Sequence, residues 1–297
     1  MSNYNTETVN VQFLNQSFLD KIDQGMTKEA GVAMSAFVRQ KLREDGFTRK
    51  VLNPIMVTAA ELDRQLTEEP TIIVEKEPDS VAANLPFLGR AEIRYFKTAR
   101  YPVTFQKITS VEFKKSKFEL ATYRTDIRTV LQENSVKDLQ EQEDVGFYNN
   151  IVAVATANSN VHTMSGGFTK TNLLAGVKYM LANRLPVGCI LMTQSMYNDL
   201  LAFPSTEIGS PAASELFRGQ ATLDNFFGYK IITTNKTNIL PVNRAIVFAP
   251  EAYLGQCYLL ADATVFLKAE LDQIMFQTYE AIGVGLGNVN GAVVLDF

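Results

Sequence analysis

The sequence is poor in the residue types that hydrolytic and metal-dependent active sites most often use. Its 297 residues include one histidine, His162, and two cysteines, with no tryptophan. A catalytic triad would need a nucleophile and an acid beside His162, and no G-x-S-x-G motif presents such a serine. One histidine and two distant cysteines also cannot form a zinc site or a histidine-containing di-iron site. We interpret His162 as structural or incidental, and we expect no catalytic residue, metal or cofactor.

The sequence also lacks the signals of secretion, membrane insertion and thiol chemistry. Cys189 and Cys257 lie in apolar surroundings, whereas a nucleophilic cysteine needs a positive and partly exposed setting. We therefore expect two small core residues in a reducing compartment. The opening MSNYNTETVN has no basic region followed by an apolar one, and no apolar run approaches the roughly 18 residues of a membrane span. We expect a soluble protein that is intracellular when it is made.

No overall excess of basic residues is present, but charge is distributed unevenly. The net charge is −4, which argues against a general nucleic-acid coat or a polybasic membrane binder. A hydrophobic content of 46% and a charged content of 20% are those of a folded protein with one large or two modest domains. Residues 86–118 contain eight basic and two acidic residues, a net charge of +6, whereas residues 133–144 have a net charge of −4. The two segments are candidates for complementary contacts.

Two glycine-containing segments superficially resemble phosphate-binding loops. Gly283, Gly285 and Gly287 suggest a dinucleotide loop, but Asn288 occupies the position of a required glycine and only about ten residues follow. We interpret this segment as a glycine-rich turn between two strands. In SGGFTKT, residues 165–171, Thr169 stands where a phosphate loop requires glycine, and no strand leads into the segment. We reject both motifs.

A long helix is predicted in the middle of the chain, from Ser135 to Asn158. Ser135 is a suitable N-cap, and apolar residues recur at three- and four-residue spacing. Asp138, Glu141 and Asp144 lie on another face, where they could bind a divalent ion. We favour a solvated acidic face instead.

Before this helix, a basic β-hairpin is predicted. Residues 91–96 and 103–108 alternate in the manner of strands, and residues 111–120 continue the pattern. A long hairpin with little to pack against is marginal by itself and needs a neighbour. Its aromatic residues could stack on single-stranded nucleic acid. Alternation turns many of them to the buried side, so we favour a protein partner, steered by the acidic helix.

The other segments divide into an N-terminal arm and a C-terminal α/β unit. The arm, residues 1–53, has candidate helices at 15–23 and 27–45, and it is followed by a short helix at 58–66 and a strand at 71–75. A short helix at 125–132 leads into the long one. Downstream we predict helices at 171–183 and 194–202, a loop at 204–227 with a short helix at 213–217, and strands at 188–193, 228–234, 244–249, 265–269, 276–282 and the C-terminal GAVVLDF.

This order of parts resembles the Hong Kong 97-type fold of tailed-phage major capsid proteins. KITSVEFKKSKFELATYRTDIRTVLQENSVKDLQEQ resembles that family's passage from the second hairpin strand to its spine helix. LPVGCILMTQSMYNDLL resembles its axial strand and helix, and FFGYKIITTNK with NRAIVFAP resembles the next two strands. The resemblance implies an α+β fold with four parts: an N-terminal arm (1–53), an extended β-hairpin (86–120), an axial domain (159–262), and a peripheral domain with the spine helix (54–85, 121–158 and 263–297).

The function implied by the resemblance is that of a major capsid protein. Such subunits form the hexamers and pentamers of an icosahedral shell around double-stranded DNA, assembled in the bacterial cytoplasm. The resemblance also implies a portal, possible decoration proteins and packaged DNA bound without sequence specificity as partners. Because the chain begins almost at once with arm-like sequence, we expect a separate scaffolding protein. We expect contacts between subunits at Arg90, Arg94, Lys97, Arg100, Lys114, Lys115, Lys117, Glu141 and Asp144.

Three other interpretations stay open at this point. An encapsulin, a bacterial compartment that holds cargo enzymes, shares the fold but begins with a short cargo-docking helix in place of a long arm. An α/β enzyme could use residues 159–262, although the scarcity of histidine and the lack of a phosphate loop disfavour it. A single-stranded nucleic-acid binder could use the hairpin, which would leave the α/β half unexplained.

Overall fold

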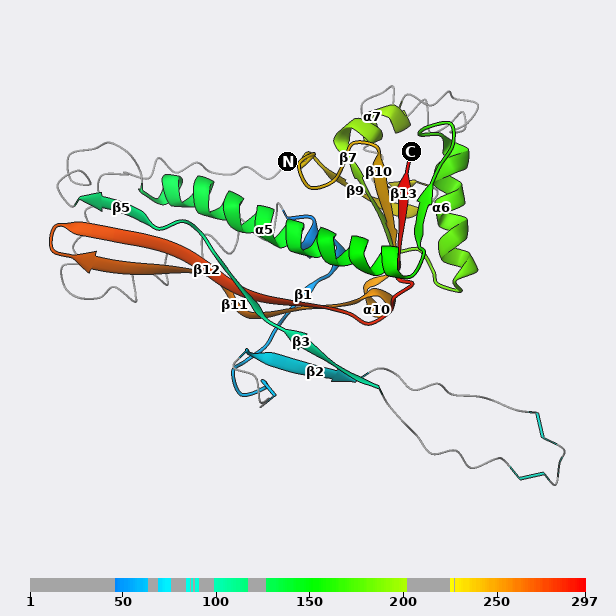
Figure 1. Ribbon diagram of the computed structural model, residues 1–297, viewed down its shortest axis with the longest axis horizontal. Helices are drawn as coiled ribbons and strands as arrows, with labels where there is room; N and C mark the ends of the chain where they lie inside the picture. Colours follow the sequence, from blue (N-terminus) through cyan, green and yellow to red (C-terminus); the bar gives the residue numbers. More distant parts are fainter. Residues whose placement is uncertain are drawn as a thin grey trace, which may run out of the picture.

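The computed structural model describes residues 46–63, 69–75, 84, 85, 87, 89, 90, 99–116, 127–201, 225, 226 and 228–297, with the backbone alone for 127–137, 201, 225 and 226. The predicted helices at 15–23, 27–45 and 213–217 and nearly all of the predicted loop at 204–227 lie outside these residues. Within the described ranges the chain forms a mixed α+β structure in which one long helix spans two sheets (Figure 1).

The long helix α5 runs from Ile127 to Ala157 and has 31 residues, roughly 46 Å at the usual helical rise. It joins the two predicted helices at 125–132 and 135–158 into one. The prediction of an N-cap at Ser135 is therefore wrong, because no glycine or proline lies between Ile127 and Ser135 to end the first helix. The apolar stripe is confirmed: Leu139, Phe147 and Ile151 are at most 1% exposed.

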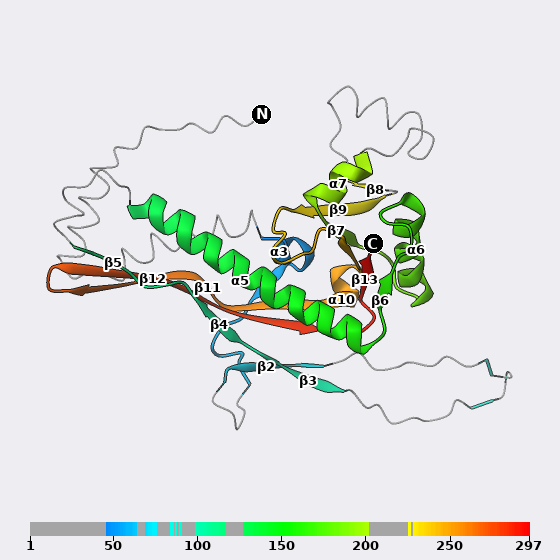
Figure 2. The ribbon, with the colours of Figure 1, turned by 45° about the horizontal axis from the view of Figure 1, so that its top comes forward.

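Beneath α5 lies a long antiparallel ribbon made of β11 (Gly255–Glu270) and β12 (Gln273–Leu286), as Figures 1 and 2 both show. Strand β1 (Pro54–Met56) pairs in parallel with β11, whereas β4 (Gln106–Thr109) and β5 (Phe113–Ser116) pair antiparallel with β12. Both predicted strands, 265–269 and 276–282, are confirmed as parts of this ribbon.

The predicted glycine-rich turn at 283–287 is wrong, because Gly283 and Gly285 lie inside β12. The structure gives the reason for both glycines. A Cβ atom on Gly285 would lie 2.6 Å from Val103 Cγ2, and one on Gly283 would lie 3.2 Å from Val103 Cγ1. The glycines leave room for the chain around Val103 to cross the ribbon closely.

That crossing segment forms the base of a hairpin. β2 (Thr71–Glu75) pairs antiparallel with β3 (Arg100–Thr104), in a register from Thr71 opposite Thr104 to Glu75 opposite Arg100. The predicted strand at 71–75 is confirmed. The predicted strand at 103–108 is divided at Phe105 between β3 and β4, so residues 106–109 and 113–116 belong to the ribbon sheet and not to a free hairpin. The other predicted strand, residues 91–96, lies outside the described residues.

The second sheet has the strand order β6-β13-β10-β7-β9-β8. Its strands are β6 (Val161–Thr163), β7 (Cys189–Thr193), β8 (Asn225–Phe226), β9 (Tyr229–Thr234), β10 (Arg244–Phe248) and β13 (Ala292–Asp296). Helices α6 (Lys170–Ala182) and α7 (Gln194–Leu201) pack beside it in Figure 1. The strands and helices predicted at 171–202 and 228–249 are confirmed, as is the C-terminal strand.

Two short helical turns complete the description, α3 (Thr48–Val51) and α10 (Glu251–Leu254). The helix predicted at 58–66 is wrong over residues 58–63, which form a turn in which Glu61 Oε2 accepts hydrogen bonds from Thr58 N and Oγ1. The main core lies between α5 and both sheets and includes Phe47, Phe147 and Phe248. Of the helices within the described ranges, none combines the length and the apolar character needed to cross a membrane.

Candidate functional site

The predicted basic contact residues fall into two separate groups. Arg90 is exposed, and Arg100 forms an ion pair with Glu75 across the hairpin base, with Nη2 2.7 Å from Oε1. Lys114 and Lys115 are exposed on β5, opposite Met275 and Ile274 of the ribbon. The structure thus separates the ribbon lysines from the hairpin arginines. Arg94, Lys97 and Lys117 lie outside the described residues.

The predicted acidic face of α5 does not exist as one surface. Asp138 is exposed and Glu141 is half-buried, with its carboxylate accepting a hydrogen bond from Asn238 Nδ2. Asp144 is fully buried. A helix turns by about 100° per residue, so three-residue steps drift around it and the trio covers about 120°.

Both carboxylate oxygens of Asp144 have partners within the chain. Its Oδ1 accepts hydrogen bonds from Thr48 N at 3.0 Å and Thr48 Oγ1 at 2.7 Å, and its Oδ2 lies 2.6 Å from Lys236 Nζ. The expectation that Asp144 belongs to a solvated face is therefore wrong. Because its side chain is fully buried, Asp144 is also unsuited to a contact between subunits.

A groove of about 620 Å³ runs between strand β4 and the exposed side of α5. One wall carries Asp138 and Glu141, and the other includes Val111, which is 69% exposed. Within the described residues β4 is an edge strand, paired with β12 on one side only. The groove therefore combines negative charge, apolar surface and an open strand edge, which are the features that extended segments recognise.

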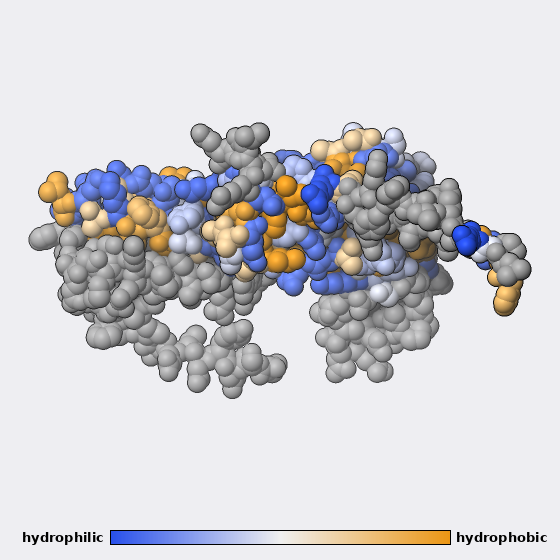
Figure 3. Space-filling model, turned by 90° about the horizontal axis from the view of Figure 1, so that it is seen from below, coloured by the Kyte–Doolittle hydropathy of each residue, from blue (hydrophilic) through white to orange (hydrophobic). Residues whose placement is uncertain are grey.

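An apolar patch lies on the opposite side of the ribbon sheet. Figure 3, which views the molecule from below, shows apolar residues gathered in the middle of this face, over the region where β1, β2 and β3 lie in Figure 1. The exposed apolar side chains on these strands include Ile55 (43%), Met56 (51%) and Ile73 (38%). Contiguous exposed apolar side chains of this kind are typical of protein contact surfaces.

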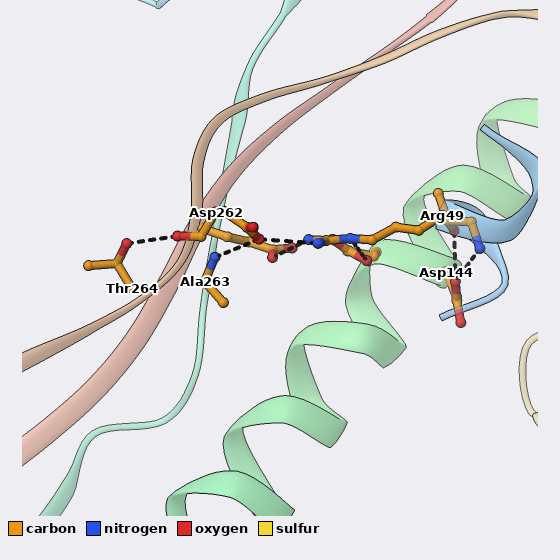
Figure 4. Close-up of polar contacts among 8 residues, drawn as sticks. Arg49, Asp144, Asp262, Ala263 and Thr264 are labelled. Carbon is orange, nitrogen blue, oxygen red and sulfur yellow. Dashed lines mark hydrogen bonds and ion pairs between the residues drawn. The ribbon is translucent and has the colours of Figure 1, made fainter. Parts of the chain in front are cut away.

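The most unusual polar feature is a buried cluster that the sequence patterns did not reveal. Arg49 of α3 binds Glu143 of α5 with Nε at 2.9 and 3.1 Å from the two carboxylate oxygens. Its Nη1 lies 3.1 Å from Asp262 Oδ1 of β11, and its Nη2 lies 3.1 Å from Glu280 Oε2 of β12. Figure 4 shows the Arg49 side chain pointing toward Asp262. These four side chains are at most 1% exposed.

A local irregularity in β11 directs Asp262 into this cluster. The register between β11 and β12 shifts on both sides of Ala261, before and after it, which marks a β-bulge. Asp262 Oδ1 also accepts a hydrogen bond from Ala263 N, and Thr264 Oγ1 donates one to Asp262 O, as Figure 4 shows. A bulge is not visible in a hydrophobic pattern. The sole clue in the sequence was Glu143, four residues before the buried Phe147 and thus on the apolar stripe of α5.

The histidine and the two cysteines lie in surroundings typical of side chains that pack and do not react. His162 lies in β6 and its ring stacks on Tyr179, with centroids 3.8 Å apart and planes within 6°, and burial lowers its pKa. Burial raises the pKa of Cys189 to about 11 and that of Cys257 to about 12. The prediction of two core cysteines is confirmed, since both are buried. Thr169 caps α6 by accepting a hydrogen bond from Asn172 N.

Comparison with solved structures shows which known fold this is. A structure from Microbacterium phage Oxtober96 matches with a TM-score of 0.63 and 10% identity, over 85% of this chain and 91% of that chain. The capsid structure of cyanophage P-SCSP1u matches with a TM-score of 0.55 and 13% identity, over 82% of this chain and 86% of that one. The chain has the fold of a tailed-phage capsid protein.

A further match is to a structure described as a virus-like particle. The crystal structure of a virus-like particle from Pyrococcus furiosus has a TM-score of 0.55 and 15% identity, over 89% of this chain and 98% of that chain. No family model and no curated protein sequence matches the chain significantly. The likeness therefore rests on tertiary structure, and the capsid fold covers nearly the whole chain.

Proposed function

We propose that this protein is the major capsid protein of a tailed phage. It self-assembles into the hexamers and pentamers of an icosahedral shell that encloses double-stranded DNA. The observation that carries the proposal is a capsid fold over 85% of this chain and 91% of a phage chain. Its features fit a shell subunit better than an enzyme, because its open surfaces are an apolar patch, a strand edge and a hairpin base.

The proposed organisation is of the Hong Kong 97 type. An N-terminal arm (1–53) precedes a peripheral domain that contains the spine helix α5 and the β11–β12 ribbon. The axial domain takes residues 159–262. We propose that the extended hairpin has the β2–β3 pair at its base. We propose that the arm and the hairpin contact neighbouring subunits.

We propose that the hairpin of one subunit occupies the groove beside α5 of the next. The hairpin offers Arg90 and Arg100 among the described residues, with Arg94 and Lys97 between them in sequence. The groove offers Asp138 and Glu141. Opposite charges steer such a contact and fix its register. Lys114 and Lys115 of β5, followed in sequence by Lys117, belong to a separate proposed contact.

The proposal implies further partners by its chemistry. We propose a separate scaffolding protein and a portal as partners in assembly, with decoration proteins as further partners on the outer surface of the shell. Packaged DNA would be held without sequence specificity, and no membrane is involved. The protein would be assembled in the host bacterial cytoplasm and would end in the virion. We propose no catalytic role.

A second candidate is an encapsulin-type compartment shell. The observation that supports a shell other than a phage capsid is the match to a virus-like particle from Pyrococcus furiosus, a cellular organism, over 98% of that chain. The two candidates share the shell and differ in the content, which is DNA in one and a cargo enzyme in the other.

Negative-stain electron microscopy of the purified protein, with sedimentation velocity, tests the proposal. Closed shells or rings of five or six subunits are expected, with or without co-expressed scaffold. A monomer or dimer under every condition, including addition of scaffold and crowding agent, would contradict it. DNA in shells produced during infection indicates a capsid, whereas an enclosed enzyme indicates the compartment.

The hairpin contact has its own test by charge exchange. Arg90→Glu and Glu141→Arg should each abolish closed shells, and the double variant should restore them because the pair is re-formed with reversed sign. Lys178→Glu, an exposed change on α6, serves as the control for an unrelated charge reversal. Failure of both single changes to alter shell yield would argue against this contact while leaving the capsid proposal intact.

A further inference from the structure

A pocket of about 670 Å³ lies between the base of the hairpin, the short helix α10 and one end of the ribbon. Its lining comes from β2 and β3, from α10, from the start of β11 and from the residues just after β12, and we call it the Tyr253 pocket. No described residue lines both this pocket and the groove beside α5. The Tyr253 pocket is therefore a second concave site, within the size range of ligand-binding pockets.

The lining of the Tyr253 pocket carries negative charge. It includes the carboxylates of Glu75 from β2 and Glu251 from α10, and no lysine or arginine is among the described residues that line it. Glu75 Oε1 lies 2.7 Å from Arg100 Nη2, so the charge of Glu75 is largely balanced. Glu251 Oε1 accepts a hydrogen bond from Asn53 N at 3.1 Å, but Glu251 forms no ion pair within the described part of the chain. Its charge is thus available to a cation from outside.

Two tyrosine rings line the pocket together with these carboxylates. Tyr253 of α10 is 52% exposed, and Tyr101 of β3 is half-buried. A Cβ atom added to Gly287 would lie 3.1 Å from Tyr101 Oη, which places this hydroxyl group beside the ribbon. The face of an aromatic ring attracts a cation, because its π electrons carry partial negative charge. The exposed ring of Tyr253 and the carboxylate of Glu251 therefore favour the same kind of ligand.

Two amide side chains supply hydrogen-bond donors to the same pocket. Gln256 of β11 accepts a hydrogen bond from Tyr258 Oη through its Oε1. Asn288 accepts one from Asn290 N through its Oδ1, at 3.0 Å. Both amide oxygens are engaged in this way, whereas neither amide nitrogen donates to another described residue. Because amide N–H groups bind carbonyl oxygens, the lining combines acceptors for a cation with donors for a peptide carbonyl group.

We propose that the Tyr253 pocket binds an arginine side chain presented by an extended segment of a partner protein. The guanidinium group stacks on the Tyr253 ring and pairs with Glu251. Gln256 and Asn288 donate to backbone carbonyl groups of the same segment. Arginine fits better than lysine, because its planar guanidinium group stacks on aromatic rings and is more weakly hydrated than an ammonium group. This inference does not depend on the proposed function, because every residue of the pocket belongs to one chain.

Ligand-observed NMR titration of the unassembled full-length protein with N-acetyl-arginine amide tests the proposal. The expected dissociation constant is on the order of 1 mM, since so small a ligand has few groups to offset the cost of association. N-acetyl-citrulline amide has nearly the same shape without the charge and should bind about tenfold more weakly. N-acetyl-lysine amide keeps the charge without the planar group and should bind about threefold more weakly.

Four variants locate the binding of the arginine probe. Glu251→Gln keeps an oxygen for the hydrogen bond from Asn53 N and removes the charge, so binding should weaken about tenfold. Tyr253→Leu removes an exposed ring and should weaken binding by a similar factor. Tyr253→Phe keeps the ring and should bind as the wild type does. Asp199→Asn, which removes an exposed carboxylate from α7, is the matched control and should leave binding unchanged.

Three results would overturn the proposal. Equal binding of the arginine and citrulline probes would mean that the pocket does not recognise charge, and equal binding of the lysine probe would remove the preference for guanidinium. Unchanged binding in both Glu251→Gln and Tyr253→Leu would place the probe elsewhere on the protein. Absence of binding at probe concentrations far above the expected constant would rule out the site. Shell formation enters none of these measurements, so the capsid proposal stands or falls separately.

Discussion

Lys236 Nζ lies 2.6 Å from Asp144 Oδ2, and this ion pair joins the loop after β9 to the middle of α5. The Asp144 side chain is fully buried, whereas that of Lys236 is 26% exposed. The pair therefore connects the second sheet with the long helix. An aspartate buried in this way depends on its partners, since water cannot replace them.

We predict that Lys236→Met lowers the free energy of unfolding by about 2 kcal/mol, because the buried Asp144 carboxylate keeps only its bonds to Thr48. Urea denaturation at neutral pH measures the change. Lys178→Met, which removes an exposed lysine from α6, is the matched control and should change stability by less than about 0.5 kcal/mol. Equal effects of the two substitutions would show that the ion pair does not matter.

Two glycines should respond in opposite ways to alanine. A Cβ atom on Gly285 would lie 2.6 Å from Val103 Cγ2, so Gly285→Ala should destabilise by about 1–3 kcal/mol through overpacking at the hairpin base. Gly146 lies inside α5, and a Cβ atom added there would meet no atom within 4 Å outside the adjoining turns of the helix. Gly146→Ala should therefore stabilise by about 0.5–1 kcal/mol through helix propensity. Thermal unfolding of the two variants checks both signs.

Both cysteines should be unreactive in the native protein at pH 8. Burial raises the pKa of Cys189 to about 11 and that of Cys257 to about 12, so almost no thiolate is present at that pH. A chromogenic disulfide reagent should detect no thiol within minutes in buffer and two thiols per chain in urea. Rapid reaction of one thiol in buffer would contradict the burial of that side chain.

The single histidine permits a clean test of pH dependence. Burial lowers the pKa of His162 below its usual 6.5, so the unfolded chain binds the extra proton first as the solution is acidified. The stability that depends on neutral His162 is present above about pH 6.5 and is lost as the pH falls through the lower folded value. His162→Phe keeps a ring to stack on Tyr179 and cannot titrate.

The melting temperature of the wild type should therefore fall more between pH 7 and pH 5 than that of His162→Phe. The carboxyl groups titrate equally in both proteins, so the difference reports His162 alone. Parallel curves would indicate that the His162–Tyr179 stack is insensitive to the charge on the imidazole.

Regular elements were predictable wherever the local pattern was strong. The helix at 171–183 and the strands at 188–193 and 244–249 form as expected because their apolar periodicity is also their burial pattern. A serine is a good cap and so predicts a helix start at Ser135, but a cap residue does not end a helix that good helix formers precede. Local preference was right about the element and wrong about its boundary.

The candidate contact residues were harder to predict because exposure depends on what packs against a side chain. Glu141 and Asp144 are three residues apart on the same helix, and one borders an open groove while the other is covered by Thr48 and Lys236. The spacing of Gly283 and Gly285 is typical of a turn. Their role, which is to leave room for Val103 of β3 where it crosses β12, depends on the tertiary structure. Neither the burial of Asp144 nor the close crossing at the two glycines can be predicted from residues that are neighbours in sequence.

By itself, the sequence determined the long central helix, the helices and strands of the second sheet, and the burial of both cysteines. These follow from composition and periodicity, which act over a few residues. Only the tertiary structure decided that Arg49 meets Glu143, Asp262 and Glu280, across as many as 231 positions. The physical reason is that the energy of a buried charge depends on the groups around it in space, and a bulge at Ala261 brings one of those groups into place.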